Sequence, residues 1–228
     1  MVKILPSASL NEAQEAIQKI YGLPDDRLYS VWDLLSNQQR FAMRALKGIR
    51  QGDKRKVKLN LIISFCWILA IMNRLHINLE ESVWQRFPYR CSYCGKCPCA
   101  CKKNKVRKRI KFLPDGSKKP TSLTGLQNMF REIYPSSQRS LEHAGIHLAE
   151  ELGELSESIH MFFGEHKESY FQKITVEATD FFSCIVGIAN SANFDIAKEL
   201  AHLFRNNCHV CHKAPCVCDF SLVAKFKS

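Results

Sequence analysis

Two neighbouring stretches decide the fold: HLAEELGELSESIHMFFG at residues 147–164 and KITVEATDFF at residues 173–182. Apolar residues recur in the first stretch at helical spacing, which predicts an amphipathic helix. They are Leu148, Leu152, Leu155, Ile159 and Phe162. The second stretch and its continuation to Ile188 are apolar nearly all round, so we expect that helix to be buried. Together the two patterns predict an all-α protein.

Five carboxylates lie on these two expected helices: Glu150, Glu151, Glu154, Glu177 and Asp180. Because Glu177 and Asp180 are three residues apart, they share one face of the second helix, where an uncompensated charge is costly. Two facing helices can gather such carboxylates around one or two Mg2+ ions, since Mg2+ prefers oxygen ligands. The alternative for the first three glutamates is a solvated helix face.

The order E-E-x-x-E, an interval, then E-x-x-D resembles the MazG-like all-α nucleoside triphosphate pyrophosphohydrolases. The resemblance spans roughly residues 123–205 and includes the continuation VEATDFFSCIVGIANSANFDIAKEL. It implies cleavage of a nucleotide between its α and β phosphates, dependent on Mg2+ or Mn2+. Glu151, Glu154, Glu177 and Asp180 would hold the metal. Glu150 is the candidate, by elimination, for orienting the attacking water, although the sequence does not separate it from Glu151.

The first half of the chain shows helical spacing as well. Ser9 and Glu12 fit a capping box that opens a helix over residues 9–22, which we expect Gly22 and Pro24 to end. Further helices are expected from about Leu28 to Ile49, from about Lys56 to Leu75, and near Leu79.

These helices recur in the second half, which indicates a tandem duplication. Asn73 and Cys91 reappear 117 positions later as Asn190 and Cys208. Four further pairs lie 113 positions apart: Leu10 and Leu123, Gln14 and Gln127, Ile20 and Ile133, Tyr21 and Tyr134. We therefore expect two tandem four-helix units that form a pseudo-dimer.

The first copy lacks the acidic ligands. By sequence displacement, the five carboxylates correspond there to Gln38, Gln39, Ala42, Asn60 and Ile63. None of these can be an anionic ligand, so we expect one active and one degenerate copy. In the resembled family, active sites tend to be completed across subunit contacts, which would explain why an inert copy is retained. The alternative is a packing partner only.

The degenerate copy is basic where the active copy is acidic. Arg40, Arg44 and Lys47 lie at helical spacing and so share one face. Because guanidinium groups suit phosphate recognition, one hypothesis is that this face points at the triphosphate. The alternative is a solvated face.

Nine of the eleven cysteines fall into two clusters, CSYCGKCPCAC at residues 91–101 and CHVCHKAPCVC at residues 208–218. Both fit C-x-x-C-x-K-x-P-C-x-C. In an intracellular chain such spacing favours metal over disulfides, and four thiolates suit a closed, structural Zn2+ site. One zinc is assigned to Cys91, Cys94, Cys99 and Cys101, and the other to Cys208, Cys211, Cys216 and Cys218.

Alternatives remain for these clusters. His209 and His212 could substitute as zinc ligands, and an iron–sulfur cluster would use the same cysteines. Cys97 has no cysteine counterpart, since Ala214 stands at the matching position, and we treat it as a spare. The remaining two cysteines, Cys66 and Cys184, lie in apolar helices and are expected in the core.

Charge is concentrated in one segment. The net charge is +11, and residues 102–119 carry nine Lys or Arg against one Asp. This segment could bind nucleic acid, cover an anionic nucleotide or be a solvated linker. Residues 106–112 alternate in a way that suits a short hairpin, and residues 114–117 carry a turn signal.

No membrane partner is expected. The N-terminus lacks the apolar core of a signal peptide, and the longest uncharged run, Leu59 to Asn73, is too short to span a bilayer comfortably. We therefore expect a soluble, cytoplasmic protein; the alternative for that run is a helix on a membrane surface.

The expected organisation has three parts. Residues 1–101 form the degenerate unit with its knuckle, residues 102–121 a basic linker, and residues 122–228 the active unit with its knuckle. The expected function is a nucleotide pyrophosphohydrolase acting on (d)NTPs or related nucleotides, with a homodimer as a further expectation. The alternative is a non-catalytic nucleotide sensor or a zinc protein that binds nucleic acid or protein.

Overall fold

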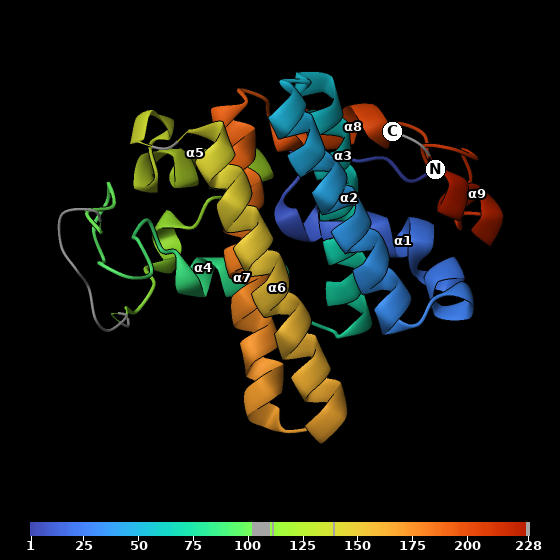
Figure 1. Cartoon of the computed structure of the whole chain (residues 1–228), viewed down its shortest axis with the longest axis horizontal. Coiled ribbons are helices and arrows are strands. Elements are labelled where there is room, and N and C mark those ends of the chain that lie inside the picture. Colours follow the sequence, from blue (N-terminus) through green and yellow to red (C-terminus); the bar gives the residue numbers. More distant parts are fainter. Residues whose placement is uncertain (102–109, 111, 139, 227–228) are drawn as a thin grey trace. The chain divides into compact units, whose positions relative to one another are not determined.

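The computed structural model describes residues 1–101, 110, 112–138 and 140–226, and in these residues all regular structure is helical. In the described part of the chain nine elements are α-helices, and two are 3-10 turns at Gly116–Lys118 and Ser136–Gln138 (Figure 1). The predicted all-α class is confirmed for the described part of the chain. The hairpin expected at residues 106–112 falls mostly outside the described residues.

The first helix, α1 (Leu10–Leu28), begins at the expected capping box, in which Ser9 and Glu12 each accept a hydrogen bond from the other's backbone N–H. Its predicted end at Gly22 and Pro24 is wrong, because the helix continues to Leu28. A proline removes the hydrogen bond to the carbonyl four residues earlier. That carbonyl, on Ile20, accepts the backbone N–H of Cys216 at 2.7 Å instead.

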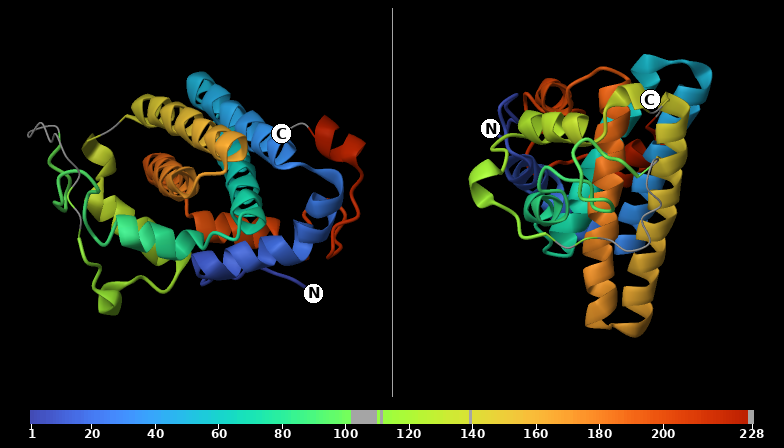
Figure 2. Two further views of the ribbon diagram at one scale, coloured as in Figure 1. Left: turned by 90° about the horizontal axis from the view of Figure 1, so that it is seen from below. Right: turned by 90° about the vertical axis from the view of Figure 1, so that its left-hand side faces the viewer.

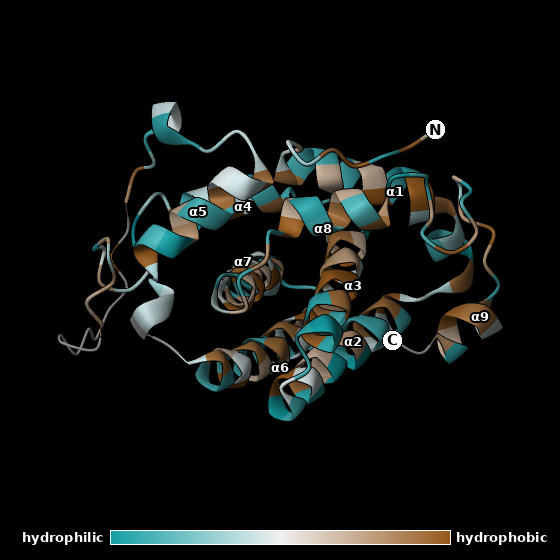
Figure 3. Ribbon diagram, turned by 90° about the horizontal axis from the view of Figure 1, so that it is seen from above, coloured by the Kyte–Doolittle hydropathy of each residue, from teal (hydrophilic) through white to brown (hydrophobic). Residues whose placement is uncertain are grey.

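Helices α2 (Val31–Gln51) and α3 (Lys54–Arg74) follow α1 and pack against each other as a hairpin. Gly52 ends α2 in the left-handed conformation, with φ of 68°, as its position at a predicted helix end requires. In the described residues α3 is the one helix long and apolar enough to cross a membrane by length and composition. Most of it is buried in the protein, and its apolar colouring extends over much of its length (Figure 3).

Helices α6 (Leu141–Glu165) and α7 (Glu168–Ser191) form a second, longer hairpin (Figure 2). α7 also packs against α4 (Leu79–Arg86) and α5 (Leu123–Ile133), which buries it as predicted. Two further helices follow, α8 (Ile196–Leu203) and α9 (Phe220–Lys225).

The chain forms two compact units whose boundaries differ from the expected ones. Unit 1 comprises Met1–Asn78 and Phe194–Ser228, and unit 2 comprises Leu79–Asn193. The expected division at residues 101 and 122 instead assigned α4 and the first cysteine cluster to the first unit. Each compact unit therefore takes three helices from one repeat and its fourth helix and cysteine cluster from the other. Such an exchange costs little, because equivalent elements find equivalent contacts in either copy.

One hydrogen bond recurs in both units, as a duplication predicts. In unit 1 the side-chain amide of Asn73 donates to the backbone carbonyl of Gln14 at 3.0 Å. In unit 2 the amide of Asn190 donates to the carbonyl of Gln127 at 3.2 Å. The pair joins α1 to α3 in one unit and α5 to α7 in the other, so the two units share a helix arrangement at this point.

The buried positions of α2 and α6 show that one predicted residue pairing between the two repeats is wrong. Both α2 and α6 follow a capping serine, and their buried residues agree at a displacement of 110 rather than 112. The matched pairs are Leu34 and Ala144, Gln38 and Leu148, Ala42 and Leu152, Ala45 and Leu155, Ile49 and Ile159. The pairing of Glu150, Glu151 and Glu154 with Gln38, Gln39 and Ala42 is therefore wrong. Their true counterparts are Arg40, Phe41 and Arg44, so the first copy still lacks these ligands.

Candidate active site

Three of the predicted carboxylates meet on α6 and α7 of unit 2. Oxygens of Glu151, Glu177 and Asp180 all lie within 4.8 Å of one another. Glu177 and Asp180 are buried, each 6% exposed, and Glu151 is half-buried. Oxygens that share one divalent cation at about 2.0–2.6 Å must lie this close together. The arrangement is therefore compatible with the expected metal site.

Two buried carboxylate oxygens of this cluster lack compensating partners. One oxygen of Glu151 and one of Glu177 are buried without a hydrogen-bond partner. Burial, reinforced by the charge of Asp180, raises the pKa of Glu151 to about 8 and that of Glu177 to about 7. Because unpartnered buried carboxylate oxygens are costly, the cluster fits an oxygen-binding cation such as Mg2+ or Mn2+.

The other two predicted site residues, Glu150 and Glu154, are exposed on α6. Both line a cavity of about 510 Å3 that the cluster also borders. A hydrogen bond from the protonated side chain of Glu177 to the carboxylate of Glu154 contributes to the raised pKa of Glu177. Glu150 stands with its Oε2 3.9 Å from Nδ1 of His147. All five predicted carboxylates therefore belong to one locality, with Glu151, Glu177 and Asp180 at its centre.

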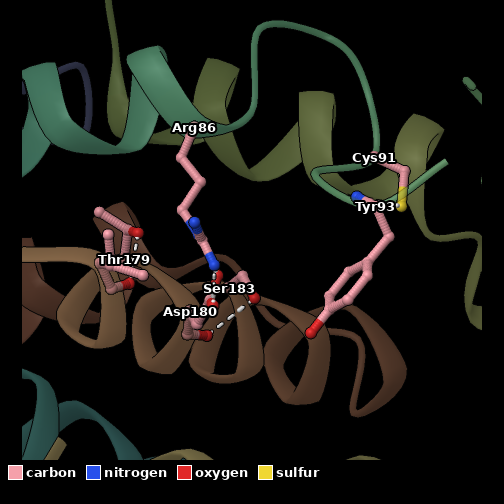
Figure 4. A network of polar contacts seen from close by, with 7 residues as sticks. Arg86, Cys91, Tyr93, Thr179, Asp180 and Ser183 are labelled. Carbon is pink, nitrogen blue, oxygen red and sulfur yellow. Dashed lines mark hydrogen bonds and ion pairs between the residues drawn. The ribbon is translucent and has the colours of Figure 1, made fainter. Parts of the chain in front are cut away.

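Arg86, at the end of α4, is a site residue that the sequence reasoning missed. Its guanidinium donates from Nε to Asp180 Oδ1 at 2.5 Å and from Nη2 to Asp180 Oδ2 (Figure 4). Burial alone would lower the pKa of Arg86, but its hydrogen bonds and ion pair with Asp180 raise it. Such a two-pronged pair is a strong, directional contact. Arg86 therefore neutralises one carboxylate of the cluster.

Tyr93, between the first two cysteines of the 91–101 cluster, also belongs to this site. Its ring extends from the cluster toward α7, the helix that carries Asp180 (Figure 4). Burial and then the charges of Asp180 and Glu151 raise the pKa of Tyr93. Tyr93 and its neighbours in the 91–101 cluster line the 510 Å3 cavity. The cysteine cluster is thus a wall of the carboxylate site.

The eight predicted zinc ligands form two tight groups of four sulfurs. The Sγ atoms of Cys91 and Cys101 are 3.6 Å apart, and sulfur pairs in the second group are 3.5–3.9 Å apart. Four sulfurs about 2.3 Å from one zinc in a tetrahedron would lie about 3.8 Å apart. In each group a backbone N–H bonds the first sulfur at 3.4 Å, from Tyr93 and from Val210. Both groups fit structural zinc.

The remaining cysteines and histidines stay outside these groups. Cys97 is exposed and is not among the four ligands, as expected of a spare. His209 instead lies with Nδ1 3.1 Å from the Tyr21 hydroxyl, and neither it nor His212 joins the sulfur group. Cys66 and Cys184 are buried core residues, as predicted. The sulfurs in each group therefore suffice for tetrahedral coordination.

The basic face of α2 is already engaged within unit 1. Arg40 donates to the carbonyls of Ala224 and Val223 at 2.9 and 3.1 Å, and Arg44 donates to the carbonyl of Phe226 at 2.9 Å. The last carbonyls of a helix lack partners within it, so these guanidinium groups cap α9. Lys47 is exposed. These bonds give Arg40 and Arg44 a structural task other than the hypothesised phosphate contact.

A comparison of equivalent positions in the two repeats could have identified Arg86 and Tyr93 as site residues. At the displacement of 117, Arg86 corresponds to Leu203, Tyr93 to Val210 and Asp180 to Ile63. Positions where one copy is polar and the other apolar mark residues that the common fold does not need. Arg86 and Tyr93 lie in the first repeat, however, and only the exchange of α4 brings them to the carboxylates of the second.

No protein family, curated protein or solved structure matches this chain.

Proposed function

We propose that unit 2 is a metal-dependent nucleotide pyrophosphohydrolase, which cleaves (d)NTPs or related nucleotides between the α and β phosphates. One observation carries the proposal. Glu151, Glu177 and Asp180 converge within 4.8 Å, and two of their buried oxygens lack partners, beside a cavity of about 510 Å3. A cavity of this size can hold a nucleotide. The MazG-like order of these carboxylates supports the reaction class.

In this proposal Glu151, Glu177 and Asp180 hold Mg2+ or Mn2+, with Glu154 beside them. When bound, the metal would offset the negative charge of the phosphates. Glu150 stands exposed at the cavity edge, where its carboxylate can accept a hydrogen bond from water and orient it toward phosphorus. The products are a nucleoside monophosphate and pyrophosphate.

The two zinc ions have a structural role in this proposal, because four thiolates leave no open coordination position. Their thiolates need a reducing compartment, which is consistent with the expected cytoplasmic location. The pairing of the two repeats as a pseudo-dimer and a further homodimer remain predictions.

Product analysis tests the proposed function. Zinc-loaded protein is incubated with Mg2+ and a panel of NTPs and dNTPs, alongside Glu151→Gln and Asp180→Asn. Asp25→Asn is the matched control, because Asp25 is a buried carboxylate of unit 1 that lines a smaller cavity, of about 80 Å3. We expect monophosphate and pyrophosphate from wild type and Asp25→Asn, and at least ~100-fold slower turnover in the other two variants. Nucleotide binding without turnover by wild type would favour the sensor alternative.

A further inference from the structure

The residues of unit 1 that match Arg86, Asp180 and Tyr93 are apolar, although Asp25 and His209 lie near two of them. Leu203 and Ile63 line a cavity of about 80 Å3, at the places of Arg86 and Asp180. The second cysteine cluster carries Val210 where the first carries Tyr93. Three polar residues of unit 2 thus have apolar counterparts in unit 1, although the helices and cysteine clusters of the two units match. Because all three polar residues are replaced together in unit 1, they are expected to serve one common role in unit 2.

We infer that the first repeat completes the nucleotide site of the second: α4 and the first cysteine cluster supply Arg86 for the phosphates and Tyr93 for the base. This inference depends on the proposed function and names two residues that the carboxylate motif does not include. Both residues come from the repeat that lacks the acidic ligands. That repeat is then retained for what its fourth helix and cysteine cluster contribute, in addition to its packing.

The contact of Arg86 with Asp180 places a guanidinium beside the phosphate position. A cation bound by the cluster and the guanidinium compete for the same two Asp180 oxygens, and their like charges repel. Arg86 is held on α4 next to the cluster, so once released from Asp180 it can reach an anion bound there. A guanidinium suits phosphate because it offers paired donors in one plane. Arg86 is thus a positioning residue for the phosphate chain.

Tyr93 lines the same cavity as the carboxylates of α6. The residue is 43% exposed and lines the cavity, so its aromatic ring is accessible to a ligand there. Stacking on an aromatic ring strengthens nucleotide binding and tolerates any base, because every base has an aromatic face. Tyr93 can therefore hold the base while Arg86 and the metal cluster hold the phosphates.

Metal and nucleotide affinities test this inference separately. Mn2+ binding and binding of an α,β-methylene nucleoside triphosphate are measured by calorimetry on zinc-loaded protein, for wild type and Arg86→Met. We expect Mn2+ to bind about 10-fold more tightly to Arg86→Met, because the competing charge is gone. We expect the analogue to bind about 10- to 100-fold more weakly, because a charged hydrogen-bond donor is lost. Arg90→Met, an exposed arginine of the same segment, should change neither.

The opposite directions of these two changes separate phosphate positioning from a purely structural role. If Arg86 only fastens α4 to α7, both affinities fall in Arg86→Met, and that result would overturn the inference. Unchanged analogue affinity would also overturn it while leaving the proposed function intact. If wild type binds Mn2+ but no analogue, the proposed function and the inference fail together.

A second variant pair keeps the inference testable if Arg86→Met does not fold. Tyr93→Val installs the residue of the other cluster at a partly exposed position, so the fold should tolerate it. We expect about 10-fold weaker analogue binding with unchanged Mn2+ affinity. The reciprocal Val210→Tyr should leave both unchanged. Equal analogue affinities in Tyr93→Val and wild type would contradict the role of Tyr93.

Discussion

Unit 1 and unit 2 use the same helix arrangement for different ends. Both hold a Gln–Asn bond between two helices and a group of four sulfurs in which the third cysteine donates its backbone N–H to a helix carbonyl, on Ile20 in unit 1 and on Ile133 in unit 2. The face of α7 carries Glu177 and Asp180, whereas the matching face of α3 carries Asn60 and Ile63. Because both faces are buried in helical units of the same plan, the fold does not need the carboxylates. The comparison separates residues that build the unit from residues that serve a site.

The largest expected effect concerns what the units share. Removing either zinc should destabilise the protein by at least about 5 kcal/mol, because metal binding by such a site is coupled to folding. We therefore expect two zinc ions per chain in wild type and one in Cys94→Ser or Cys211→Ser, with early thermal unfolding in both variants. Cys97→Ser is the control and should keep two ions. A single ion in wild type would show that the two clusters are not equivalent.

The next prediction concerns variants that place the charged pair of unit 2, Arg86 and Asp180, at the matching apolar positions of unit 1. Ile63→Asp introduces an unpaired carboxylate at a buried position of unit 1, beside a cavity that Asp25 also lines, and should cost about 3–5 kcal/mol in chemical denaturation. Adding Leu203→Arg recreates the pair found at Arg86 and Asp180 and should recover part of that loss. If the double variant is no more stable than Ile63→Asp alone, the positional equivalence of the two pairs is wrong.

A smaller effect compares the two Asn side chains. Asn73→Ala should cost about 1 kcal/mol, the value of one ordinary hydrogen bond. Asn190→Ala should cost about 2 kcal/mol, because Asn190 also accepts from the side chains of Gln127 and Arg131, at 3.0 and 3.2 Å. Urea unfolding measures both. Equal costs would mean that the extra bonds in unit 2 add nothing.

The smallest effect is the pH dependence of the metal-free site. The pKa of Glu151 is raised to about 8 and that of Glu177 to about 7, so the folded protein keeps protons that the unfolded chain releases near pH 4.5. Stability should therefore fall as pH rises from about 5 to 8. Solvent screening limits the Glu151 contribution to on the order of 1 kcal/mol, or about 3 °C in Tm.

Glu151→Gln should reduce this slope, whereas Glu157→Gln, an exposed change on the same helix, should not. Mn2+ should stabilise wild type more at pH 8 than at pH 6, because it binds the ionised carboxylates. A metal-free stability that rises between pH 5 and 8 in step with Glu151 ionisation would contradict the burial argument.

Most of the helices and both cysteine clusters could be predicted from the sequence, because local sequence signals agreed with the fold. The apolar stripe of residues 148–162 and the capping box at Ser9 placed helices correctly, and the repeated cysteine pattern placed both sulfur groups. The predicted helix end at Pro24 was wrong, because the backbone N–H of Cys216, almost two hundred residues away, donates to the Ile20 carbonyl that the proline leaves unbonded. A tertiary contact of this kind has no local signature.

The exchange of α4 and α8 between repeats was not predictable from spacing. Identical repeats offer each fourth helix equivalent partners in either copy, so the pattern of apolar residues is the same for both connections. Arg86 was missed for this reason, since its partner Asp180 lies in the other repeat. The predicted offset of 117 residues between the two repeats nevertheless applies to α3 and α7, because no insertion or deletion changes the spacing there.

The most direct test of the central claim is Mn2+ binding to zinc-loaded protein at pH 8, measured by calorimetry. The claim is that unit 2 alone holds a divalent cation on its buried carboxylates. We expect Mn2+ to bind wild type and Asp25→Asn alike, and binding to be lost in Asp180→Asn. Mn2+ binding that survives in Asp180→Asn but disappears in Asp25→Asn, or no binding to wild type, would contradict the account.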